Sequence, residues 1–166
     1  MIVPITLEEA QRLVSLYHSH HKAPRRVKLA IGWEEASELV ACVVFEAPKA
    51  EALARERTTW EVSRLCIGPK APRYCASRLL GAASRAAEAC GVERLVSYTR
   101  QDEAGTCYRA AGWHPAALVR GREHTSGNRA LRWLPGLYEP TTEIVDRVRW
   151  ERGPRAAPAI AWPEAR

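Results

Sequence analysis

The sequence predicts a single mixed α/β domain, with a mostly antiparallel sheet flanked by helices. Apolar runs of strand length alternate along the chain with amphipathic runs of helix length. Two strand-like runs, 27–33 and 39–46, are joined by a short polar connection that favours a hairpin. A third run, 59–67, leads through a proline-containing loop into a long helix. Hairpin-linked strands combined with helix-linked strands predict a mixed sheet.

The individual elements follow from local signals. Residues 2–5 predict a short strand, and the capping box Thr6-Leu7-Glu8-Glu9 begins a helix. Apolar residues at helical spacing predict a second helix that starts at Tyr74 or Ser77 and ends before Gly91. The other expected segments are a charged connection at 48–57, a strand at 94–99, a helix at 102–111 and late strands at 131–134 and 145–150. We expect one domain over 1–152 and a Pro/Ala-rich tail over 153–166.

Composition narrows the class of protein. The chain has 166 residues and is 46% hydrophobic and 27% charged, which is typical of one globular domain. Neither a membrane-length apolar run nor a secretory signal is evident, so we expect a cytoplasmic monomer or homodimer without a membrane partner. The five cysteines show no CxxC spacing, which favours reduced thiols over disulfides or a zinc site.

Positive charge is concentrated in the later part of the chain. The net charge is +6, and residues 61–166 contain 17 basic and 11 acidic side chains. This excess is compatible with binding to nucleic-acid phosphates. An arginine bias that arises from base composition explains it equally well, so charge alone does not decide.

A phosphate-binding loop is predicted between Ile67 and Ser77, after the strand expected at 61–67. A strand that passes through a loop into a helix presents the free amides of the helix N-terminus, which favour a bound phosphate. Arg73, in that loop, can add charge-assisted hydrogen bonds. The signal is weak by itself, because every strand–loop–helix unit contains such a junction.

A second motif makes the interpretation specific. Tyr108 is followed by three residues and then by Gly112-Trp113. This spacing resembles the end of the fourth helix in GNAT (Gcn5-related N-acetyltransferase) enzymes. The resemblance implies acetyl-CoA or another acyl-CoA as cofactor, Tyr108 as the group that protonates the leaving thiolate, and splayed central strands at 61–67 and 95–99. It also implies cofactor contacts from Leu65, Cys66, Ile67, Arg73, Tyr74, Cys75, Ala76 and Ser77.

The loop departs from the usual GNAT pattern, which has Gly-x-Gly or Gly-x-Ala before the helix. Here the residues are Pro72-Arg73-Tyr74-Cys75-Ala76-Ser77. Together with the His-rich segment before Pro24, the stretch Glu61-Val62-Ser63-Arg64-Leu65 and the Gly-Trp ending, this loop resembles phage proteins of the Mom group, which modify adenine in viral DNA. That resemblance implies DNA as partner and a base flipped out of the duplex.

Several polar side chains are candidates for chemistry. Glu61 is a candidate base for the incoming amine, with Ser63 and Asp102 as further catalytic candidates. An exposed strand-end carboxylate explains Glu61 equally well, and Asp102 also suits a helix N-cap. The candidate substrate contacts are His18, His21, Lys28, Arg64 and Tyr98.

His18, His20 and His21 form a histidine cluster, for which metal binding is the less favoured interpretation. For the whole chain, the leading hypothesis is acyl transfer from CoA to a nucleic-acid base. A small-molecule or protein amine N-acetyltransferase is the second hypothesis. A non-catalytic nucleic-acid-binding module is the third.

Overall fold

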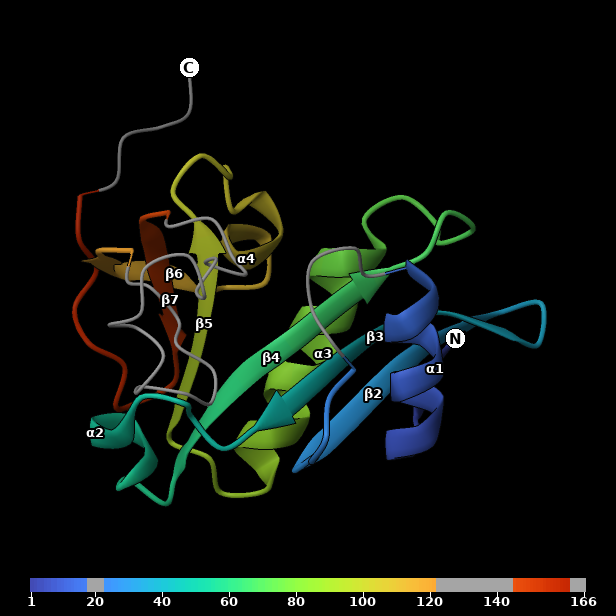
Figure 1. The fold of residues 1–166 in the computed structure, drawn as a ribbon, viewed down its shortest axis with the longest axis horizontal. Helices are drawn as coiled ribbons and strands as arrows, with labels where there is room; N and C mark the ends of the chain where they lie inside the picture. Colours follow the sequence, from blue (N-terminus) through green and yellow to red (C-terminus); the bar gives the residue numbers. More distant parts are fainter. Residues whose placement is uncertain (18–22, 122–144, 162–166) are drawn as a thin grey trace, which may run out of the picture.

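The computed structural model describes residues 1–17, 23–121 and 145–161, and within them seven strands form one open sheet (Figure 1). The strands are β1 (Ile2–Pro4), β2 (Leu29–Glu35), β3 (Glu38–Glu46), β4 (Thr59–Ile67), β5 (Arg94–Arg100), β6 (His114–Val119) and β7 (Arg147–Arg152). The helices are α1 (Leu7–Tyr17), α2 (Glu51–Ala54), α3 (Cys75–Ala89) and α4 (Thr106–Ala110).

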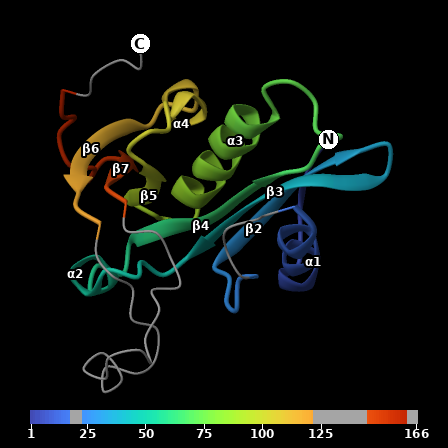
Figure 2. The same cartoon turned by 45° about the horizontal axis from the view of Figure 1, so that its top comes forward.

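The sheet order is β1-β2-β3-β4-β5-β7-β6, and every neighbouring pair is antiparallel except β4 and β5. Helix α1 lies on one face, while α3 and α4 lie on the other (Figure 2). Each face therefore has its own apolar core: α1 packs Leu13 and Val14 against β2–β4, and α3 packs Leu79 and Leu80 on the opposite side. The predicted fold class is confirmed.

The predicted capping box is present at the start of α1. Thr6 Oγ1 accepts a hydrogen bond from Glu9 N at 3.2 Å, and Glu9 Oε2 accepts one from Thr6 N at 2.8 Å. These two bonds satisfy amides that have no partner within the helix, which explains why the chain turns into α1 directly after β1.

Two local predictions need correction. The connection predicted over 48–57 contains the short helix α2. The helix predicted over 102–111 is confined to α4, because Gly105 takes a left-handed conformation (φ 61°) at its N-cap and residues 101–104 form a turn. Gly105 therefore occupies the N-cap position for which Asp102 was suited. The strand expected at 131–134 lies outside the described residues.

Residues 153–161 have no regular secondary structure but hydrogen-bond back to the sheet. Ala157 N donates to Glu151 Oε2 at 2.6 Å, and Ile160 N donates to Pro115 O at 2.8 Å. The domain boundary at 152 stays a prediction. Among the described residues, no helix is both long and apolar enough to cross a membrane.

Candidate active site

The centre of the sheet opens between β4 and β5. Only Thr59–Glu61 pair with Arg94–Val96, after which each strand continues without pairing to the other. Since β3 occupies the other edge of β4, the β4 edge that faces β5 has backbone groups beyond Glu61 that pair with no β5 residue. The predicted splaying of the two central strands is confirmed.

Glu61 stands at the point where the strands part. Its side chain is buried, and Oε2 accepts a hydrogen bond from Lys49 N at 2.9 Å. Burial raises the pKa of Glu61 above its ordinary value, against the lowering effect of the Lys49 amide. A carboxylate with a raised pKa at an opening is suited to accept a proton.

Tyr98 and Arg149 lie on the same face of the sheet as Glu61. Val62 packs in the α3 core and Ser97 points toward α4, so strand alternation directs Glu61 and Tyr98 to the opposite face. Arg149 of β7 is paired with Tyr98 across the sheet. Burial raises the pKa of Tyr98 and the Glu61 charge adds to the rise, whereas the Arg149 charge and its hydrogen bond oppose it.

The buried carboxylate of Glu151 lies between two arginines, Arg94 and Arg149. Glu151 is fully buried and accepts two hydrogen bonds from Arg94, Nε to Oε2 at 3.0 Å and Nη2 to Oε1 at 2.8 Å. Nε of Arg149 lies 2.8 Å from Glu151 Oε1, without the alignment of a hydrogen bond. Arg94 in turn contacts Glu56 at 3.4 Å. Acidic and basic groups therefore alternate from Glu56 to Arg149.

The remaining predicted residues of this region lie at the same end of the sheet. Ser63 Oγ donates to Val44 O at 3.4 Å, at an irregularity in the β3–β4 register. Arg64 Nη1 donates to Ser63 O at 2.6 Å, and Lys28 Nζ lies 5.5 Å from the centre of the Trp60 ring. Their roles as catalytic or substrate-binding groups stay predictions.

Tyr108 occupies the opposite face of β5, where it is packed in the core. Its hydroxyl lies 2.7 Å from Ser97 Oγ, and its ring stacks on Trp150 and meets the edge of Trp113. Burial raises the pKa of Tyr108 far above its ordinary value, despite the hydrogen bond to Ser97. In this arrangement the hydroxyl is a weak proton donor with a structural partner.

In the loop before α3, the residue Tyr74 adopts a left-handed backbone conformation that favours glycine. Tyr74 is the N-cap of α3 and has a left-handed conformation (φ 63°), which costs a non-glycine residue about 1–2 kcal/mol. The Tyr74 side chain is exposed and contacts the Arg73 guanidinium at 4.7 Å. The amides of Ala76 and Ser77 precede the first helical hydrogen bond, from Arg78 N to Tyr74 O. A helix start of this kind fits a phosphate.

The other predicted cofactor residues divide between core and loop. Cys66 is buried beneath α1, where its thiol lies 3.8 Å from Leu13 O, and Cys75 is buried in the α3 core. Burial raises the pKa of Cys75, as expected for a packing residue. Leu65 is partly buried against the α3 core, and Ile67 is exposed at the end of β4.

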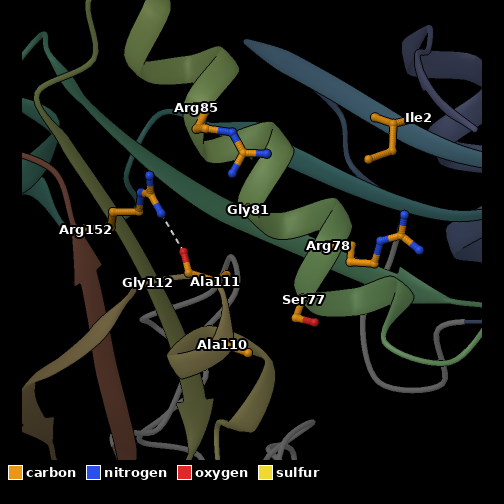
Figure 3. A pocket seen from close by; sticks show the side chains of 9 residues that line it. All are labelled: Ile2, Ser77, Arg78, Gly81, Arg85, Ala110, Ala111, Gly112 and Arg152. Atoms are coloured by element: carbon orange, nitrogen blue, oxygen red, sulfur yellow. Dashed lines mark hydrogen bonds between the residues drawn. The ribbon is translucent and has the colours of Figure 1, made fainter.

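A groove of about 580 Å³ lies between α3 and α4 (Figure 3). Small residues form much of its surface, with Gly81 on α3 and Ala110 to Gly112 after α4. Arg78 and Arg85 extend from α3 at its border. Arg152 also lines it but is bound to Glu88 and to Ala111 O. A polyanionic ligand suits a groove with cationic borders.

Asp102 makes no described contact with the other candidate residues of this site. The Asp102 carboxylate lies in an exposed turn and binds Arg100 Nε at 3.1 Å, a hydrogen bond that lowers the pKa of Asp102. His18, His20 and His21 lie outside the described residues. Within the described part of the chain, no cluster of His, Cys, Asp and Glu is arranged to hold a metal ion.

Comparison with models of protein families shows to which family the chain belongs. The model of the Mom protein family matches residues 1–127. The chain belongs to the Mom protein family. No curated protein matches the sequence.

Solved structures agree with this Mom family chain in fold. The ribosomal-protein-S18-alanine N-acetyltransferase from Escherichia coli is 14% identical, with a TM-score of 0.64 over 97% of this chain and 95% of that chain. A putative acetyltransferase from Salmonella typhimurium, solved with acetyl-CoA, is 13% identical, with a TM-score of 0.64 over 97% of each chain. At such identity the likeness establishes the GNAT-like fold.

Sequence reasoning missed Arg94, Arg149 and Glu151, as well as the groove residues Arg78, Gly81 and Arg85. The alternation of charge in Arg147-Val148-Arg149-Trp150-Glu151-Arg152 is the one local signal that marks β7 as a strand with a polar face.

Proposed function

We propose that this Mom family protein transfers an acyl group from an acyl-CoA thioester to an amino group of a DNA base, with adenine as the acceptor that the family implies. The observation that carries the proposal is the opening beyond Glu61 and Val96, where a buried carboxylate with a raised pKa stands at the last paired position of β4 and β5. The match to the Mom family supports a DNA base as the class of acceptor.

The residues fit a CoA thioester on the side of the sheet that carries α3 and α4. The amides at the start of α3 suit its pyrophosphate, and Arg78 and Arg85 suit the remaining phosphate or the ribose. When bound, the thioester supplies an activated acyl carbonyl. Amides of β4 beyond Glu61, which pair with no β5 residue, are suited to polarise that carbonyl.

DNA would approach from the other face, where Glu61 and Tyr98 lie. Arg25 and Arg26 are exposed just before β2, and Lys28 N donates to Phe45 O, next to the β4 residue Val62. This basic segment is therefore near the end of the sheet at which Glu61 stands. Its side chains are suited to phosphate contacts that position a DNA strand.

The acceptor is tested by analysis of DNA nucleosides. We expect plasmid DNA from cells that express the protein to yield an adenine nucleoside heavier by one acyl group. Glu61→Gln should lower the yield by about 100-fold or more, because the amide cannot take the proton of the amine. In the wild type the rate should fall as the pH drops through the raised pKa of Glu61. Unmodified DNA together with an acylated small amine would instead identify a small-molecule acetyltransferase.

The groove is tested at Gly81. A leucine there should fill the floor between Arg85 and Ala111 and weaken CoA binding by roughly tenfold or more, as measured by calorimetry. Gly81→Ala is the matched control, since its Cβ would lie 3.5 Å from Arg85 Nη1 and 3.9 Å from Ala111 Cβ, which are ordinary contacts. The alanine should keep CoA affinity and stabilise α3 by about 0.5–1 kcal/mol. Equal affinity in both variants would place CoA elsewhere.

A further inference from the structure

Two tyrosines flank the opening of the sheet, and they lie on opposite faces of β5. Tyr108 comes from α4 and meets Ser97, which points to the α4 face. Tyr98 belongs to β5 itself and lies two residues beyond Val96, the last β5 residue that pairs with β4. Tyr98 therefore belongs to the part of β5 that parts from β4, and Tyr108 is packed against the other face of that same part.

We propose that Tyr98, positioned by Arg149, gives a proton to the departing sulfur of CoA, and that Tyr108 is a core residue. This inference rests on the proposed function and assigns to Tyr98 the step that the GNAT resemblance implies for Tyr108. It follows first from the contacts of Tyr108. The Tyr108 ring is enclosed by Trp113 and Trp150, its hydroxyl is paired with Ser97, and the residue is only 6% exposed.

The surroundings of Tyr98 suit a proton donor better. Tyr98 is partly exposed and lies opposite Arg149 in the β5–β7 register, and the Arg149 charge lowers the pKa of Tyr98 against the effect of burial. A guanidinium stabilises the phenolate that remains after the proton has left. Among the described residues, the charged groups that shift the pKa of Tyr98 are Glu61 on β4 and Arg149 and Glu151 on β7. For Tyr108, the described groups that shift the pKa are Ser97, Cys107 and Glu103, and no cation is among them.

Glu61 accepts and returns the proton that the reaction releases. The acceptor nitrogen forms a bond to the acyl carbon, the bond from that carbon to sulfur breaks, the amine proton passes to Glu61, and the Tyr98 proton passes to the sulfur. Glu61, on the same face, then returns its proton to the Tyr98 phenolate, directly or through one water. The products are the acylated amine and free CoA thiol, and both side chains regain their starting charge.

Arg149 is a positioning residue in this scheme, and Glu151 fixes Arg149. The Arg149 Nε lies 2.8 Å from Glu151 Oε1, while Arg94 and the Ala157 amide hold the same carboxylate. Glu151 thus holds Arg149 at a position of β7 that lies directly opposite Tyr98 in the β5–β7 pair.

The test compares matched variants of the two tyrosines. Tyr98→Phe should lower kcat for DNA modification by about 100-fold while the affinity for CoA stays unchanged by calorimetry. Tyr108→Phe should keep kcat within about threefold and lower the midpoint of urea unfolding, because the buried Ser97 hydroxyl loses its partner. The reverse ranking of the two kcat values would overturn the inference. A wild type that modifies no amine would overturn the proposed function as well.

A second measurement needs no catalysis. The ionisation of Tyr98 in the free protein is isolated by subtracting the ultraviolet titration of Tyr98→Phe from that of the parent. Arg149→Met should move this ionisation to higher pH, because the cation that lowers the pKa of Tyr98 is gone, and Arg149→Lys should restore part of the shift. Glu61→Gln should move it to lower pH. A titration unaffected by Arg149→Met would show that Arg149 does not act on Tyr98.

Discussion

Gly105→Ala should lower the free energy of unfolding by about 3 kcal/mol or more. Gly105 has a φ of 61°, and a Cβ there would lie 2.0 Å from Cζ2 and 2.6 Å from Cη2 of Trp150. Trp150 cannot easily move away, because it is fully buried, stacks on Tyr108 and donates its indole N–H to Thr99 Oγ1 at 2.9 Å. A loss of this size is a large part of the 5–15 kcal/mol that stabilises a typical domain.

Gly91 provides the matched control for this effect. It also has a positive φ, 86°, but a Cβ there would meet nothing within 4 Å. Gly91→Ala should therefore cost only the backbone penalty, about 1 kcal/mol. The measurement is urea unfolding followed by circular dichroism, and equal losses in the two variants would contradict the clash. Trp150→Phe, which removes the clashing atoms, should cost less in the Gly105→Ala background than in the wild type.

Local patterns were sufficient to predict the elements on which the site is built. The alternating run at 59–67 predicts β4 with the observed bounds, and the capping box places the start of α1. The Tyr108 to Trp113 spacing predicts the GNAT-like fold, although the structure places the Tyr108 hydroxyl against Ser97. A motif thus predicts the fold of a segment more securely than it predicts the role of one atom.

Long-range partners account for most of what the sequence does not reveal. Arg94 and Glu151 are 57 residues apart, and nothing in either segment marks them as a buried pair. The insertion of β7 between β5 and β6 brings them together, and strand order is a property of the whole sheet. The same insertion places Arg149 beside Tyr98.

The loop before α3 is a different case, because its composition is misleading. The absence of the usual glycines suggests an altered cradle, yet Tyr74 adopts the left-handed backbone that a glycine would provide. The strain is confined to this one residue. The Tyr74 ring is exposed and is not packed in the core. Sequence reasoning cannot anticipate that a tyrosine accepts this conformation.

Glu151→Gln should be the other strongly destabilising substitution, with an expected loss of about 3–5 kcal/mol. The carboxylate is fully buried between Arg94 and Arg149 and also accepts the Ala157 amide. An amide of the same shape leaves two guanidinium groups without their shared counter-charge. The loss should extend to kcat, since Arg149 would no longer be held beside Tyr98.

The dependence of stability on pH gives this prediction a second readout. Burial alone would raise the pKa of Glu151, but the hydrogen bonds from Arg94 and Ala157 and the neighbouring charges hold it below its ordinary value. A group with a lowered pKa stabilises the fold fully above the unfolded value, about 4.3, and loses that contribution as the pH falls through the folded value. The free energy of unfolding of the wild type, measured with urea, should therefore fall toward acid pH. In Glu151→Gln the part of this fall that comes from Glu151 should be absent.

Glu93→Gln is the matched control for Glu151→Gln. Glu93 also accepts a hydrogen bond, from Thr58 Oγ1 at 2.9 Å, and contacts Arg155 at 3.5 Å, but its side chain is 46% exposed. Water screens such a pair, so its removal should cost no more than about 1 kcal/mol. If both variants lost the same stability, burial of Glu151 would not be what makes its ion pairs indispensable, and the anchoring of Arg149 would lose its physical basis.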